Sequence, residues 1–157
     1  MQVAHVVGLW QVSDFLGHTA YGHELSKDVP YGRIGMEVLR AGSTLACATV
    51  LTTSIRASLF SVATAGALFA ATTLATLAVA ALIFNAIGIR ITAGVEFCAL
   101  AMGILSSPFS SAFLAKKIGF VSTSGQFFNL GLTAAVCATG LAYVGIVALR
   151  IYHAMFG

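Results

Sequence analysis

Long uncharged stretches dominate the chain after residue 40. They are separated by single charges, by a lysine pair or by a short charged segment, and they run over 41–55, 57–89, 97–115 and 118–149. A helix needs about 20 apolar residues to cross a hydrocarbon core of about 30 Å. The second and fourth stretches therefore each supply one span, and the third does so when residues 91–95 join it.

The first stretch is short, but it can continue past Arg56 to Ser61, because an arginine near a helix end can extend its charge to the headgroups. We therefore predict an all-α, polytopic membrane protein in which residues 41–157 form the transmembrane domain. Four spans are expected, near 41–61, 65–88, 91–114 and 126–150. The alternative has three spans, with the first segment lying along the membrane.

Residues 1–40 are different, since they hold four of the five acidic residues of the chain. Within them, Val3, Val6, Val7 and Trp10 follow the i, i+3, i+4, i+7 spacing of one helix face. This pattern predicts a short amphipathic helix in the membrane interface, with Trp10 as an anchor at headgroup depth. Residues 1–40 are thus expected to form a polar and amphipathic segment at the membrane surface.

Breaks between the spans are expected at residues that end or bend helices. Asn85 and Gly88 mark the end of the second span. Pro108 lies inside the third span, where it removes a backbone donor, and nearby serines can bond to backbone carbonyls.

The composition supports the membrane class. Hydrophobic residues make up 59% of the 157 residues and charged residues 8%, whereas a soluble domain has about 25% charged residues. A soluble domain of this size still leaves about 30% of its unfolded-chain surface in water. Nucleic-acid binders, disulfide scaffolds and disordered tails are excluded by the same numbers.

Small residues recur every four positions along the predicted spans. Such rows let helix backbones approach closely in lipid, within one chain or between chains. The predicted helix-packing residues are Ala67, Ala71, Ala75, Ala99, Gly103, Gly131, Ala134, Ala135, Ala138 and Ala142.

Three charged residues stand out as candidates for intramembrane chemistry. Glu96 is the single acid after residue 40, and Arg56 and Arg90 are arginines near the ends of the predicted spans. An ionisable group at depth is costly, so it needs a partner or a purpose. Glu96 is either one half of an ion pair with Arg56 or Arg90, or a proton or cation site.

Motifs of catalysis and cofactor binding are missing from the sequence. The three cysteines fall in apolar spans without CxxC spacing, and their expected role is that of small apolar side chains. The histidines lack the spacing of metal ligands. No enzyme activity, cofactor, metal or nucleic-acid partner is therefore expected, and bound lipids are.

The leading functional hypothesis is a non-catalytic accessory subunit of a larger membrane complex, with other membrane subunits as partners. Small, alanine-rich, four-span subunits of this kind occur in energy-transducing complexes, so the mitochondrial inner membrane is the first location considered and a bacterial inner membrane the alternative. A second hypothesis is a self-assembling homo-oligomeric channel or transporter, with Glu96 lining the pathway. A third is a membrane-inserted interaction or effector protein.

Overall fold

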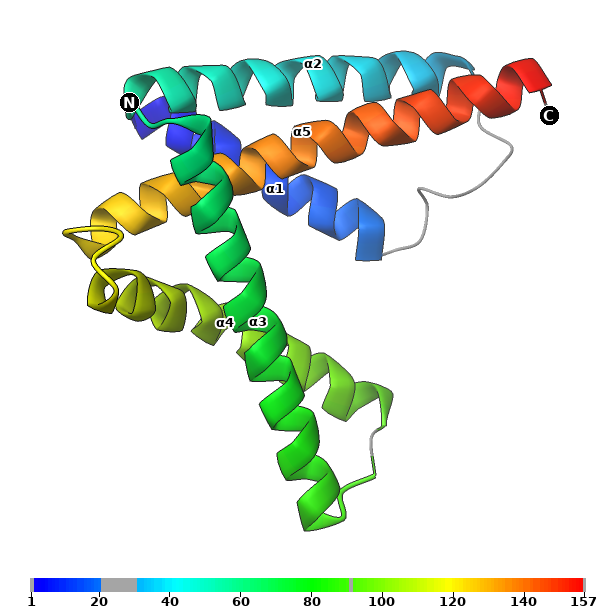
Figure 1. Ribbon diagram of the computed structural model, residues 1–157. Helices are drawn as coiled ribbons and strands as arrows, with labels where there is room; N and C mark the ends of the chain where they lie inside the picture. The colour runs from blue at the N-terminus through cyan, green and yellow to red at the C-terminus, as the bar shows by residue number, and fades with distance from the viewer. Residues whose placement is uncertain (1, 21–30, 91, 157) are drawn as a thin grey trace. The chain divides into compact units, whose positions relative to one another are not determined.

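The computed structural model describes residues 2–20, 31–90 and 92–156, and within these residues the secondary structure is helical, without strands. The five helices are α1 (Gln2–Ala20), α2 (Tyr31–Ser54), α3 (Leu59–Ile87), α4 (Ala93–Lys117) and α5 (Ser124–Phe156) (Figure 1). The all-α class predicted from the sequence is confirmed.

Three of the described helices are long and apolar enough to cross a membrane. They are the segment Ile34–Ser54 of α2, the whole of α3 and the whole of α5. The chain therefore has the build of a membrane-embedded protein. The predicted domain boundary at residue 40 falls inside α2, where good helix formers such as Met36, Glu37 and Leu39 follow Gly35 and continue the helix without a proline.

The first transmembrane helix ends earlier than the predicted 41–61. α2 stops at Ser54, and Arg56 has a φ of 50°, in the left-handed region. Hydroxyl groups offer the last turn alternative bonds, since Thr53 Oγ1 donates to the carbonyls of residues 49 and 50 and Ser54 Oγ to that of residue 51. Arg56 therefore lies in a turn before α3 and not inside a span.

Two other helix ends use glycine. Gly88, with a φ of 74°, follows α3, and Gly119, with a φ of 76°, follows α4. At the first of these ends the amide of Gly88 donates to the Asn85 carbonyl and that of Ile89 to the Phe84 carbonyl. This is the Schellman arrangement, which needs a left-handed residue that glycine supplies without strain. The end predicted at Asn85–Gly88 is confirmed.

The chain forms two compact units, and the first comprises residues 1–59 and 132–157. In this unit α2 and α5 are antiparallel (Figure 1). Glu37 meets Arg150, Leu45 meets Gly140, and Leu51 packs in one cluster with Val136. Leu45 lies next to the centre of the segment Ile34–Ser54, and Gly140 is the centre of α5. The two helices are therefore centred on one another.

α1 belongs to the same unit and runs antiparallel to α2. Cys47 Sγ donates to the Ala4 carbonyl at 3.4 Å, and Gln11 Nε2 donates to Ser43 Oγ at 3.4 Å. Gly8 lets α1 approach α5 closely, because a Cβ at Gly8 would lie 3.0 Å from Cγ2 of Val136 on α5. The packed face of α1 therefore combines small and polar residues with Val12 and Phe15.

The second unit comprises residues 60–131, with α3, α4 and the first turns of α5. α3 and α4 are antiparallel, since Leu77 faces Gly103 and Ala65 clusters with Ala112 and Ala115. Val121 and Phe127 complete this core, which is built around small side chains.

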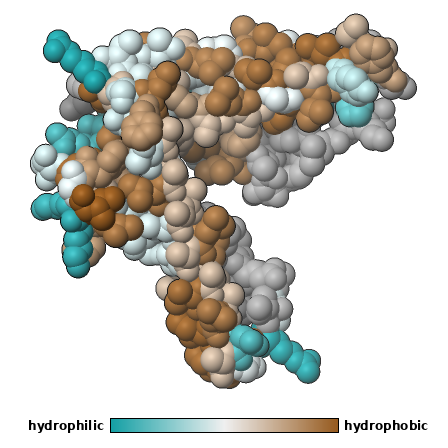
Figure 2. Space-filling model, viewed as in Figure 1, coloured by the Kyte–Doolittle hydropathy of each residue, from teal (hydrophilic) through white to brown (hydrophobic). Residues whose placement is uncertain are grey.

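α4 buries two of its four serines and exposes large apolar side chains. Ser107 and Ser111 are fully buried, and Ser111 Oγ donates to the carbonyls of Ser107 and Pro108. Its exposed residues include Met102, Leu105, Phe109 and Phe113, each about 70% exposed. The visible surface in Figure 2 is largely apolar, and hydrophilic colours gather near helix ends. This distribution suits a hydrocarbon environment.

The approach of α2 and α5 at Gly140 gives a direct test of this packing. A Cβ at Gly140 would lie 2.8 Å from Leu45 Cδ2 and 3.1 Å from its Cγ, whereas one at Gly145 meets nothing within 4 Å. Overpacking costs about 1–3 kcal/mol, so Gly140→Leu should lower the unfolding temperature in detergent micelles. The matched change Gly145→Leu should leave it within error, and equal effects of the two changes would contradict the described packing.

Candidate functional site

Four charged residues of the first unit form a cluster that joins three helices. The charge cluster consists of Asp14 on α1, Glu37 and Arg40 on α2, and Arg150 on α5. Glu37 and Arg40 are three residues apart on α2, so both project from a similar face of the helix. The cluster lies toward the start of the segment Ile34–Ser54 and toward the end of α5. It is therefore near one end of these helices.

The pair of Glu37 and Arg150 is the tighter of the two. Arg150 Nε lies 2.6 Å from Glu37 Oε2, and only 9% and 4% of the two side chains are exposed. Neither charge can be hydrated in this position, so each depends on the other for compensation. The pair fixes the register between α2 and α5.

The second pair is looser and more exposed. Arg40 Nε lies 3.7 Å from Asp14 Oδ2, with 36% and 27% of the side chains exposed. The longer distance and the greater exposure make this contact weaker than the pair of Glu37 and Arg150. Gln11 lies one turn before Asp14 and donates to Ser43, whose hydroxyl donates to the Arg40 carbonyl. These bonds orient α1 on α2.

The surroundings of the charge cluster are polar and tightly packed. Thr44 Oγ1 donates to the Arg40 carbonyl at 2.7 Å, and Phe15 meets the buried ring of Tyr143 edge to face at 5.0 Å between centroids. Gln11 Oε1 is buried without a hydrogen-bond partner among the described residues. Two acids and two guanidinium groups sum to no net charge, so the cluster is suited to holding helices together in a medium of low polarity.

The predicted intramembrane charges lie elsewhere. Arg56 is exposed in the turn between α2 and α3, and Arg90 is exposed in the connection between α3 and α4. Glu96 falls in the first turn of α4, and its side chain lies outside the described residues. The predicted ion pair of Glu96 with either arginine therefore stays a prediction.

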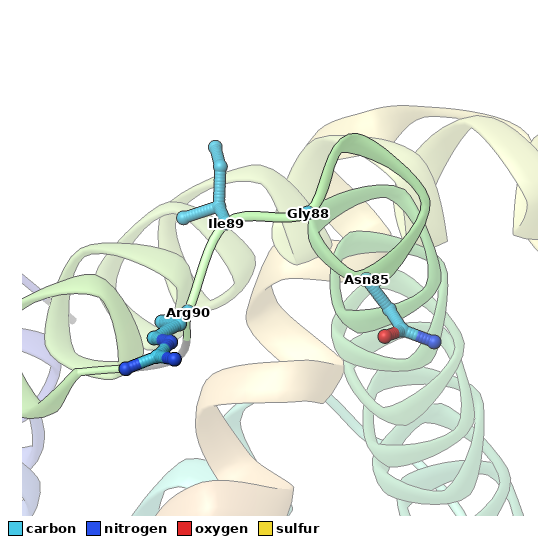
Figure 3. Close-up of a pocket in the computed structure, with 4 residues that line it drawn as sticks. All are labelled: Asn85, Gly88, Ile89 and Arg90. Carbon is cyan, nitrogen blue, oxygen red and sulfur yellow. The ribbon is translucent and has the colours of Figure 1, made fainter.

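A shallow pocket of about 410 Å³ lies at the connection between α3 and α4. Its lining includes Asn85, Gly88, Ile89 and Arg90 (Figure 3). The polar ends of Asn85 and Arg90 point in different directions in this view. No convergent set of polar groups forms there among the residues drawn.

The predicted helix-packing residues are divided between buried and exposed positions. Gly103 is buried against Leu77. The half-buried ones are Ala99, Gly131, Ala134, Ala135 and Ala142, and the exposed ones are Ala67, Ala71, Ala75 and Ala138. Trp10, the predicted interface anchor, is 66% exposed.

The cysteines differ in their surroundings. Cys47 is buried and donates to the Ala4 carbonyl, Cys137 is half-buried and Cys98 is exposed. A role as small apolar side chains therefore fits Cys47 and Cys137 better than Cys98.

The residues of the charge cluster were not among the predicted site residues. The sequence placed Asp14, Glu37 and Arg40 in a surface segment and Arg150 at the end of the last span. One signal was available, because an even number of spans brings the start of the first and the end of the last to the same side. The opposite charges of Glu37 and Arg150 then lie at the same depth in the membrane, where they can pair.

Removing one member of the buried pair should be costly, while removing both should be tolerated better. Loss of a partner from a buried ion pair costs about 3–5 kcal/mol, because the other charge is left uncompensated. We expect Glu37→Gln and Arg150→Gln each to lower the unfolding temperature in micelles, and the double variant to recover part of the loss. Asp14→Asn, at the exposed pair, is the control and should have a small effect. A double variant as unstable as the sum of the singles would contradict this account.

Comparisons of the chain with models of protein families, with curated proteins and with solved structures found no match.

Proposed function

We propose that the chain is a four-span membrane protein and acts as a non-catalytic structural subunit of a larger membrane assembly. The observation that carries the second part is a row of exposed alanines along α3. The span number comes first, because it decides which surfaces face lipid or partners.

The antiparallel packing of α2 and α5 restricts the number of spans. If both helices cross the membrane, α2 ends on the side on which α5 begins, since residue 51 is level with residue 136. The chain between them must then cross an even number of times. α3 is the most apolar of the three candidate spans, with 29 residues. If α3 crosses, α4 has to cross back.

The packing of α4 supports the same topology. α4 follows α3 in the opposite direction between the level of Leu77 and Gly103 and that of Ala65 and Ala115. Its 25 residues extend about 37 Å at about 1.5 Å per residue, which is sufficient for the hydrocarbon core. The large apolar side chains described on α4 are exposed, two of its four serines are buried, and Lys116 and Lys117 are confined to its last turn. Four spans also agree with the prediction from sequence.

The exposed face of α3 supports a role in assembly. Large side chains such as Phe60, Leu74 and Leu82 are exposed on α3 as well. Between them lies the alanine face, which consists of Ala63, Ala67, Ala70, Ala71, Ala75, Ala78 and Ala81. Helix interfaces in lipid are enriched in small residues, because these allow backbones to pack closely without a hydrophobic driving force. A helix of another subunit could therefore pack closely against the alanine face.

The setting of the assembly follows from an analogy of architecture alone. Small, alanine-rich, four-span subunits in energy-transducing complexes favour the mitochondrial inner membrane as the first location to examine, and a bacterial inner membrane as the second. Cell fractionation with an antibody to the chain tests this location. Bound lipids are expected in either membrane.

Labelling of single cysteines from the two sides of the membrane tests the number of spans. In a chain freed of its native cysteines, Arg56→Cys and Ser122→Cys should react with an impermeant reagent from one side. Arg90→Cys and His153→Cys should react from the other side, because α4 returns the chain across the bilayer. Reaction of residues 90 and 122 from the same side would contradict the four-span topology.

A bulky side chain on the alanine face tests the role in assembly. We expect Ala71→Phe to release the chain from a hetero-complex that is seen on native gels after gentle detergent extraction. Ile83→Phe enlarges an exposed α3 position off the alanine face and should leave the complex intact. The full-length chain is preferable to a deletion of residues 1–40, because that deletion removes the contacts of α1 and Glu37 with the rest of the first unit.

Two outcomes would contradict the structural-subunit proposal. The first is an Ala71→Phe chain that still co-migrates with its complex. The second is a wild-type chain that migrates as a small homo-oligomer without other proteins, which would favour the channel hypothesis instead.

A further inference from the structure

The face of α1 that points away from α2 and α5 is apolar and exposed. Between residues 3 and 17, all exposed side chains except Ser13 are apolar: Val3, Val6, Val7, Leu9, Trp10 and Leu16. We propose that α1 is inserted in the bilayer alongside α2 and α5, with this outward face against the acyl chains of lipids. The proposal rests on α2 and α5 being membrane spans, and it adds α1 as a further inserted helix to the four spans α2–α5 proposed above.

The direction of α1 carries the proposal. Gly8 packs against Val136, and Phe15 packs against Tyr143. The two contacts are seven residues apart on α1 and also seven residues apart on α5, so the two helices run in the same direction. A helix in the plane of the membrane surface would be nearly perpendicular to a span and would meet it at one level only. α1 keeps its contact with α5 over about 10 Å, at about 1.5 Å per residue. It therefore runs along the spans.

The polarity of α1 agrees with its direction. The polar side chains of Gln11 and Asp14 point inward, to Ser43 and Arg40 of α2. His5 is also partly buried. In a helix at a water interface these groups would be outside and the valines inside. The reverse arrangement is expected where the surroundings are hydrocarbon.

The contacts also give the depth of α1. Gln11 contacts Ser43, which adjoins the centre of the segment Ile34–Ser54. Trp10 is next to Gln11 on α1, and its side chain is 66% exposed. Trp10 is thus expected near the middle of the hydrocarbon core. This position differs from the headgroup depth expected for an interfacial helix.

The depth of Trp10 can be measured without a label, because it is the one tryptophan of the chain. The full-length protein is reconstituted in phosphatidylcholine vesicles that carry bromine either high or low on the acyl chains. We expect blue-shifted emission and at least twofold stronger quenching by the deep bromines than by the shallow ones. Trp10→Phe is the control and should remove the signal.

Each other outcome would overturn the proposal. Stronger quenching by the shallow bromines would place α1 in the interface. Red-shifted emission that an aqueous quencher suppresses would place the face in water. Blue-shifted emission without quenching by either lipid would show that protein, such as a second copy of the chain, covers the face.

A second measurement separates this proposal from the four-span topology. If α1 crosses alongside α2 in the opposite direction, Gln2→Cys should react from the side on which Arg56→Cys reacts. If α1 lies in the interface, Gln2→Cys should react from the side of His153→Cys. That result would contradict the position of α1 in the first unit. It would leave the four spans α2–α5 supported if residues 56 and 122 still react from one side and residues 90 and 153 from the other.

Discussion

The antiparallel packing of α2 against α5 is the constraint on which the other features of the first unit depend. Gly140 removes the side chain that would separate the two helices, and the ion pair between Glu37 and Arg150 sets their register. Two helices centred on one another at Leu45 and Gly140 share one depth, so each position on one locates a position on the other. Gly8 and Phe15 place α1 against these two helices, through contacts with Val136 and Tyr143 of α5.

The distribution of side chains in both units differs from that in a soluble protein. Buried positions hold alanines, hydroxyl residues and Glu37 beside a few large apolar residues such as Phe127 and Val136, and many exposed side chains are large and apolar. Lipid tails are as apolar as buried side chains, so burying apolar area gives little net free energy in a membrane. Close backbone contact and polar bonds supply the stability of packed helices instead. The hydroxyls of Thr44, Ser107 and Ser111 follow the same logic, as they are buried, and those of Thr44 and Ser111 bond to carbonyls of their own helices.

The charge cluster and the alanine face suit a structural role in different ways. The cluster joins α1, α2 and α5 within the chain and sums to no net charge. The alanine face of α3 is exposed in the second unit and is the surface proposed for a partner helix. A subunit that stabilises an assembly needs both properties: internal rigidity without dependence on its partners, and one surface on which a partner can pack closely.

Sequence alone determined the helical membrane class, the apolar helices and the end of α3 at Gly88, because these depend on local composition and on one glycine's backbone freedom. It did not determine where α2 ends, since Arg56 adopts a left-handed turn that local hydropathy does not predict. Nor did it identify the pair of Glu37 and Arg150, which are 113 residues apart in sequence. Only tertiary structure decided that pairing and the inward face of α1, because both follow from the register between helices, and register depends on side-chain contacts across the whole chain.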